Sequence, residues 1–470
     1  MNCTDATYSN NGFVNENGDE CEKTASSEEI WKAQDENVGP IADCEYDPYL
    51  HRTVEHPLTN TETLLHLLKI ALGTGIFAMP KAFSNSGYVV GTVGTIVVGI
   101  ITTYCVHVLV KIHYILCQRT KVSSLSYPLI AEAAVLSGPP CFRNFGPFMI
   151  QLVNVIFLIC EIGACCIYVV FISSNVKELT DYFFTLDTDV RWIMLILLLP
   201  LIFINWIRNL KFLAPLSIIG TAVTLISFGI IFYYLFREPL SLDGREAFGS
   251  IGHFPMFFGT ALFSLEAVTA IIPLENEMKS PEKFVGATGI LNRAMVVVVS
   301  FFVCMGLCGY LKYGNEIEAS ITLNLPKHEL PAQIAKALLS CAIFISNAVV
   351  TQVAIDLAWT QYFVHRLANS PRKLVWEYAL RTSIVCVTVL LAIAIPNLDL
   401  FISLIGALTL STLGLTLPAF LECCTLWHST SGTSRALLIS KNMIIACIGL
   451  AGLIIGTTIS LIAIVQLYLQ

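Results

Sequence analysis

The sequence predicts an all-α integral membrane protein with about eleven transmembrane helices. Hydrophobic residues make up 55% of the 470 residues and charged residues only 13%, whereas soluble proteins carry about 25% charged residues. Runs of about 17–25 apolar residues, the length that crosses about 30 Å of hydrocarbon, recur along the chain. Glycine and proline interrupt two of these runs, the first and the sixth. The composition excludes a soluble enzyme.

Residues 1–59 differ from the rest of the chain. They hold thirteen acidic residues against Lys23, Lys32 and Arg52, a net charge of −10, which leaves +3 for residues 60–470. An acidic, polar segment cannot bury enough apolar surface to fold by itself. We therefore predict a disordered acidic tail over 1–59 and a polytopic transmembrane transporter domain over 60–470.

The apolar runs define eleven predicted spans, and basic residues in the loops between them predict the orientation. Thirteen Lys and Arg residues lie in loops on the side of the N-terminus, outside the tail, and seven lie in loops on the other side. Because cytosolic loops carry the excess of positive charge, we expect a cytosolic N-terminus. The predicted spans are 62–82, 88–113, 147–174, 190–207, 213–236, 254–274, 287–310, 333–358, 376–396, 399–421 and 442–467.

The first and sixth spans contain residues that break helices. Gly73-Thr74-Gly75 and Pro80 interrupt the first, and Pro255, Gly259 and Pro273 interrupt the sixth. Backbone groups freed inside a bilayer need partners in protein or in a water-filled cavity. Glycine and proline are also common in membrane helices generally, but breaks five spans apart match a five-plus-five inverted repeat with one extra C-terminal helix. Such repeats bind substrate and coupling ions between the broken helices.

Charged side chains inside the predicted spans are the next candidates for function, because each costs about 2.5–3.5 kcal/mol at the centre of a span. Histidine titrates near neutral pH, so His66 suits a group that loads and releases a proton; a structural histidine at the interface is the alternative. Glu266 lies beside the second break, where it could hold a proton or brace unwound backbone. Lys69 shares the face of His66 and is typical of a snorkelling lysine. Glu161 and Asp356 are weaker candidates near a cavity wall or a span end.

Motifs for covalent chemistry are missing from the sequence. It has no metal-ligand spacing, no phosphate-binding glycine loop and no nucleophile elbow, and nothing in it suggests binding of nucleic acid. We therefore expect no enzyme activity and no cofactor. Without a phosphate site, uphill transport would draw on an ion gradient.

Several motifs in order resemble the proton-coupled amino acid transporters, a branch of the amino acid/auxin permeases in the amino acid-polyamine-organocation superfamily. The resemblance runs from about residue 60 to the end of the chain. The motifs are His66-Leu67-Leu68-Lys69, Gly73-Thr74-Gly75-Ile76, Met79-Pro80, Ile207-Arg208-Asn209-Leu210, the segment 257–264, Pro273-Leu274-Glu275-Asn276, Gly309-Tyr310-Leu311, the segment 320–326, Leu398-Asp399-Leu400 and Ile402-Ser403-Leu404.

This resemblance implies a LeuT-like arrangement of about eleven helices. It also implies symport of protons with small neutral amino acids of the alanine, glycine and proline type, across the lipid bilayer. The proton would be the coupling ion. The resemblance implies His66 for proton coupling, and Glu266 is the second coupling candidate from its place beside the break. It implies the backbone of Gly73, Thr74 and Gly75 for the substrate carboxylate. It also implies Phe263, Ser264, Leu265 and Glu266 for the amino group and side-chain pocket, and Tyr168 for the side of the pocket.

Departures from the family pattern leave the substrate open. Ile70-Ala71 and Leu265-Glu266-Ala267 replace smaller or aromatic residues of the family, and the eighth span reads differently over 351–356. An alternative function is an amino-acid sensor of the same fold, which would signal to cytosolic partners through the acidic tail with little or no transport. The plasma membrane and endolysosomal membranes both fit, since each has an acidic compartment opposite the cytosol.

Overall fold

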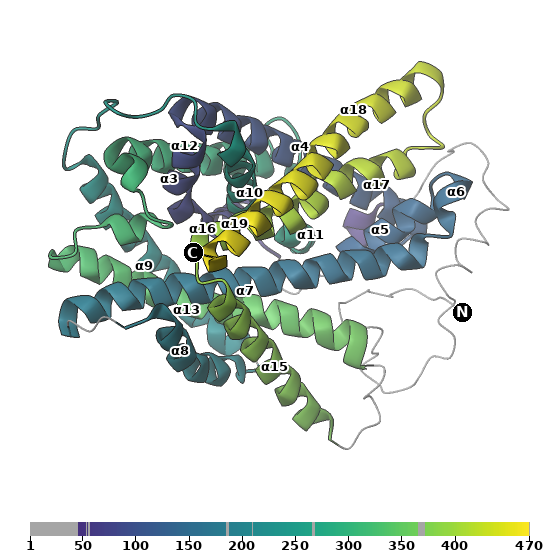
Figure 1. Ribbon diagram of the computed structural model, residues 1–470. Helices are drawn as coiled ribbons and strands as arrows, with labels where there is room; N and C mark the ends of the chain where they lie inside the picture. The colour runs from purple at the N-terminus through teal and green to yellow at the C-terminus, as the bar shows by residue number, and fades with distance from the viewer. Residues whose placement is uncertain are drawn as a thin grey trace.

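The structure, a computed structural model, describes residues 46–52, 54, 57–184, 188–208, 210–265, 268–364 and 372–469. These residues are almost entirely helical (Figure 1). Within these ranges the backbone forms no strand, apart from an isolated bridge between Leu58 and Met278. The predicted disordered tail, up to residue 45, lies outside the described residues.

Each of the eleven predicted spans coincides with helical structure. Among the described residues, nine helices are long and apolar enough to cross a membrane, or ten if the bent pair α2 and α3 counts as one span. The fourth predicted span, α8, has 16 residues and is shorter than these. The spans are α2 (Asn60–Ala71) with α3 (Gly75–Ser86), α4 (Tyr88–Thr120), α7 (Gly146–Phe184), α8 (Val190–Asn205), α9 (Leu210–Phe236), α10 (Phe254–Ser264) with α11 (Val268–Asn276), α12 (Ile290–Tyr313), α13 (Leu330–Ala358), α15 (Lys373–Ala394), α16 (Leu398–Ile405) with η7 (Gly406–Thr416) and α17 (Leu417–Thr425), and α18 (Gly432–Ala451) with η8 (Gly452–Gly456) and α19 (Thr457–Leu469).

Shorter helices fill the connections between the spans. The connection after α4, which the sequence indicates as a loop, contains the buried helix α5, in which the Tyr127 hydroxyl donates to the Leu413 carbonyl at 2.7 Å. The shorter helices are η1 (Pro48–His51), α5 (Tyr127–Leu136), α6 (Pro140–Arg143), η2 (Ile251–His253), η3 (Pro281–Lys283), η4 (Gly314–Glu316), η5 (Ile321–Asn324) and η6 (Trp359–Phe363).

Spans that lie five apart in the sequence contact each other. This holds for α3 with α10, α4 with α12, α7 with α13, and α8 with α15. Figure 1 shows α7 crossing the width of the molecule, with α8 and α15 on one side of it and α3, α10 and α12 on the other. Contact between corresponding members of two five-helix units is the arrangement expected around a pseudo-two-fold axis. The all-α membrane architecture with breaks in spans one and six is therefore confirmed.

The first break separates α2 from α3 by a bend of 52°. A capping box fixes the start of α2, because Glu62 Oε2 accepts from the Thr59 backbone N–H at 2.8 Å while Thr59 Oγ1 accepts from the Glu62 backbone N–H. At the start of α3 the backbone of Gly75 approaches α10 closely. The Ser264 hydroxyl donates to the Gly75 carbonyl at 3.0 Å, and a Cβ at position 75 would lie 2.6 Å from Ser264 Cα. Only glycine allows this approach.

The second predicted break falls between the end of α10 at Ser264 and the start of α11 at Val268. Glu266 and Ala267 lie outside the described residues, so the predicted coupling carboxylate Glu266 has no described position. The preceding turn residue, Leu265, is buried at 3% exposure. The two breaks meet where Ser264 contacts Gly75.

Residues 46–52, which the sequence assigns to the tail, contact the helical domain. Arg52 donates to the Glu275 carboxylate at 3.1 Å and to the backbone carbonyls of Glu275 and Ser123 at 3.2 Å each. The side chains of Arg52 and Glu275 are 6% and 0% exposed, and His113 Nδ1 lies 3.6 Å from the same carboxylate oxygen. The helical domain therefore includes residues before position 60, since a buried ion pair ties them to the end of α11.

We predict that Gly75→Ala destabilises the protein and Gly73→Ala does not. The new Cβ at 75 would overlap backbone of α10, whereas at 73 its nearest neighbours would be at 3.7 and 3.9 Å, an ordinary contact. Overpacking of this kind costs about 1–3 kcal/mol. Thermal unfolding of both purified variants in detergent measures the difference. Equal melting temperatures for the two variants would contradict this close approach.

We also predict that Arg52→Ala lowers the melting temperature, because it leaves the Glu275 carboxylate buried without its guanidinium. Removing one partner of a buried ion pair costs about 3–5 kcal/mol. The matched control is the double variant Arg52→Ala/Glu275→Gln, which removes both charges and should recover part of the loss. If the double variant is less stable than Arg52→Ala alone, the pair does not act as described.

Candidate functional site

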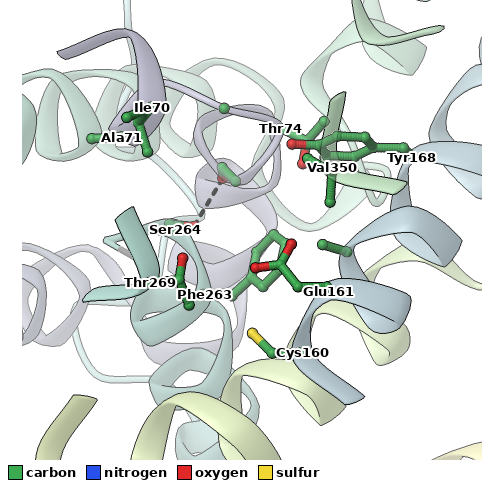
Figure 2. A pocket seen from close by; sticks show the side chains of 13 residues that line it. Ile70, Ala71, Thr74, Cys160, Glu161, Tyr168, Phe263, Ser264, Thr269 and Val350 are labelled. Carbon is green, nitrogen blue, oxygen red and sulfur yellow. Dashed lines mark hydrogen bonds between the residues drawn. The ribbon is translucent and has the colours of Figure 1, made fainter. Parts of the chain in front are cut away.

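A cavity of ≈ 120 Å³ lies beside both helix breaks. A cavity of about 150 Å³ in a protein core accepts benzene, so this one suits a small solute and is too small for a peptide. Figure 2 shows side chains from α2, α7, α10, α11 and α13 around it, together with Thr74 at the N-cap of α3. The lining residues are Ile70, Ala71, Gly73, Thr74, Gly75, Cys160, Glu161, Ala164, Tyr168, Phe263, Ser264, Thr269 and Val350.

The structure brings most of the substrate-binding candidates together around this cavity. Of the predicted residues, Gly73, Thr74, Gly75, Tyr168, Phe263 and Ser264 line it. Leu265, the C-cap residue of α10, is buried and does not line the cavity. Glu161, only a weak candidate from the sequence, does line it.

The remaining charged candidates lie away from the cavity wall. His66 and Lys69 are on an exposed face of α2. His66 is one helical turn before Ile70, so both lie on the same side of α2. Asp356 is exposed on α13, where its Oδ1 accepts from Gln352 Nε2 at 2.7 Å.

Sequence reasoning missed several lining residues. Cys160 and Ala164 lie on α7, Thr269 on α11 and Val350 on α13. The α7 residues had a signal in the sequence, because positions 160, 161, 164 and 168 recur at helical spacing and so share one face. Thr269 and Val350 had no such signal, since their place depends on how α11 and α13 pack.

The N-terminus of α3 gives one wall of the cavity a positive character. Thr74 at the helix N-cap makes no capping hydrogen bond with its side chain, and its Oγ1 is buried without a hydrogen-bond partner. The first turn of a helix also leaves backbone N–H groups unpaired and carries the positive end of the helix dipole. A hydroxyl and backbone amides at this wall can bind an anionic group such as a carboxylate.

Side chains near the cavity differ in exposure. Ile70 of α2 lines the cavity and is 42% exposed. The segment 314–325 packs over α3 and α7 with Ile317 and Ile321 buried. Lys81 of α3 donates to the Ile317 carbonyl at 3.2 Å, so this segment is held against α3.

Comparison with known proteins agrees with this architecture. The family model described as transmembrane amino acid transporter protein matches residues 56–462. The chain is 37% identical over 430 residues to the proton-coupled amino acid transporter-like protein pathetic of Drosophila melanogaster, covering 91% of this chain and 90% of that protein. It is 26% identical over 424 residues to the probable amino acid transporter skat-1 of Caenorhabditis elegans, covering 88% and 92%.

A solved structure described as the inward facing conformation of Mhp1 is similar over 92% of this chain and 95% of that chain, with 12% identity and a TM-score of 0.46. The family match covers most of the chain, including both helix breaks and the cavity between them. The chain is a multi-pass membrane protein and belongs to the transmembrane amino acid transporter family.

Proposed function

We propose that this protein carries small neutral amino acids together with protons across a membrane. The observation that carries the proposal is the cavity of ≈ 120 Å³ between two interrupted helices, with the N-terminus of α3 at its wall. A helix N-terminus favours the substrate carboxylate, and the small volume favours short side chains such as those of alanine, glycine and proline. The name of the Drosophila relative, which includes proton coupling, supports the choice of ion.

The proposed orientation has the N-terminus in the cytosol, on the basis of the excess of positive charge in the loops on that side. In this orientation α2 begins on the cytosolic side of the membrane, and substrate is proposed to leave the cavity along α2. This arrangement would release substrate into the cytosol. An acidic compartment on the other side, either outside the cell or inside an endolysosome, would supply the protons.

The coupling proton is proposed to bind His66. The histidine lies on the exposed face of α2, one turn from Ile70, which lines the cavity, and an imidazole is a group that can bind and release a proton. Glu266 stays a second candidate from the sequence. Residues 1–45 of the acidic tail through which a sensor would signal lie outside the described residues. No contact in the described part of the chain favours sensing over transport.

The proposal predicts saturable uptake of labelled alanine, glycine or proline into proteoliposomes that contain the protein. Uptake should rise when the outside is acidic and collapse with a protonophore, because the proton gradient supplies the driving force. Liposomes without protein are the control. If correctly inserted protein moves none of these substrates at acidic or neutral pH, small neutral amino acids are not its cargo.

A second prediction concerns His66. His66→Ala should remove the acid stimulation of uptake while the protein stays folded, because the exposed side chain contributes little to packing. Uptake measured at several outside pH values tests this. Leu65→Ala is the matched control, since Leu65 is the neighbouring residue on α2 and is 60% exposed. Acid-stimulated uptake of normal size in His66→Ala would exclude His66 from coupling.

A further inference from the structure

We infer that the Glu161 carboxylate binds the ammonium group of the substrate. This inference rests on the proposed function, because it assigns a residue to one end of an amino acid in the same cavity. The resemblance to the family assigns the amino group to residues 263–266, and neither it nor the names of the relatives points to Glu161. The contacts around the cavity carry it.

Glu161 occupies the wall of the cavity that α7 provides. It is 9% exposed and lines the cavity together with Cys160, Ala164 and Tyr168 from the same helix. Figure 2 shows its carboxylate reaching from α7 toward Phe263, on the side of the second helix break. A carboxylate at this position borders the space that a bound solute would fill.

The charges of the cavity wall are complementary to an amino acid zwitterion. Among the described residues that line the cavity, Glu161 is the one carboxylate, and none is a lysine, arginine or histidine. The positive contribution comes from the N-terminus of α3 and the buried hydroxyl of Thr74. A zwitterion with its carboxylate at the N-terminus of α3 and its ammonium at Glu161 places each of its charges beside a wall of opposite electrostatic character.

Burial strengthens this contact, because opposite charges attract more strongly where water is excluded. A substrate ammonium brings up to three N–H donors and a positive charge, and hydrogen bonds between charged partners are among the strongest in proteins. The substrate would therefore be selected by its α-amino group as well as by its size.

This role separates Glu161 from the coupled proton. A proton on the carboxylate would cancel the charge that attracts the ammonium, so the proton and the substrate would compete at this residue. Symport requires both to be bound together, and the proton must then bind elsewhere, as at His66. Glu161 is thus ionised when substrate binds.

The test compares two ligands that differ by the amino group, alanine and propionate, in wild type, Glu161→Gln and Glu161→Asp. Their affinities are measured as inhibition of labelled uptake and by thermal shift of the purified protein. Wild type should bind alanine more tightly than propionate. Glu161→Gln should weaken alanine about 10- to 100-fold, the size of a lost charged hydrogen bond, without weakening propionate, so that the two ligands become similar.

The matched control is Asp356→Asn, which removes a carboxylate from a span but not from the cavity. Its two affinities should stay within about twofold of wild type. Affinities do not depend on the fraction of protein that folds. If Glu161→Gln cannot be purified, Glu161→Asp serves as the second variant, and it should retain part of the preference for alanine because it keeps the charge.

Four results would overturn the inference. Equal loss of alanine and propionate in Glu161→Gln would mean that Glu161 only braces the helices. Unchanged affinities with an altered pH dependence would make it a proton carrier instead. If the wild-type protein transports alanine but binds alanine and propionate with equal affinity, there is no ammonium site, although transport remains. If the wild-type protein neither binds nor transports any amino acid, the proposed function fails as well.

Discussion

The hydrogen bond from the Ser264 hydroxyl to the Gly75 carbonyl joins the two interrupted helices at the centre of the molecule. An interruption inside a bilayer leaves polar backbone groups that lipid cannot satisfy. Two such interruptions persist because they meet each other and a polar cavity rather than lipid. The absence of a side chain at Gly75 permits this meeting, since any Cβ there would overlap α10. The cavity, its polar walls and its size all follow from this arrangement.

The other helices hold the two breaks in place. The contacts of α7 with α13 and of α4 with α12 form two of the corresponding pairs of the repeat. The buried pair of Arg52 and Glu275 joins residues 223 positions apart and ties the chain before α2 to the end of α11. Both interrupted spans are thereby connected to segments that do not line the cavity.

The cavity has a division of charge that suits its proposed substrate. Backbone amides and a hydroxyl lie at the start of α3, and a carboxylate lies on α7. The exposed histidine of α2 lies outside the lining, one turn away. Separate positions for an ammonium group and for a proton are a physical requirement of symport, because two cations that compete for one carboxylate would exchange instead of travelling together.

The sequence alone determined the membrane class, the positions of the spans and the two breaks. Hydropathy and helix-breaking residues act locally, so Gly73-Thr74-Gly75 and the end of α10 could be located without a structure. The resemblance to a family added Tyr168, Phe263 and Ser264, which share the cavity. The length of α8 and the presence of α5 were not evident, because short helices owe their stability to packing.

Only the tertiary structure decided which side chains share the cavity. Thr269 and Val350 line it, whereas His66, Lys69 and Asp356 do not. Arg52, which the sequence places in the disordered tail, forms an ion pair with Glu275. Association of helices in lipid depends on the shapes of their surfaces and on a few polar contacts, not on a hydrophobic pattern that can be read along the chain. The sequence therefore located the elements, and packing between distant helices selected the residues that form the site.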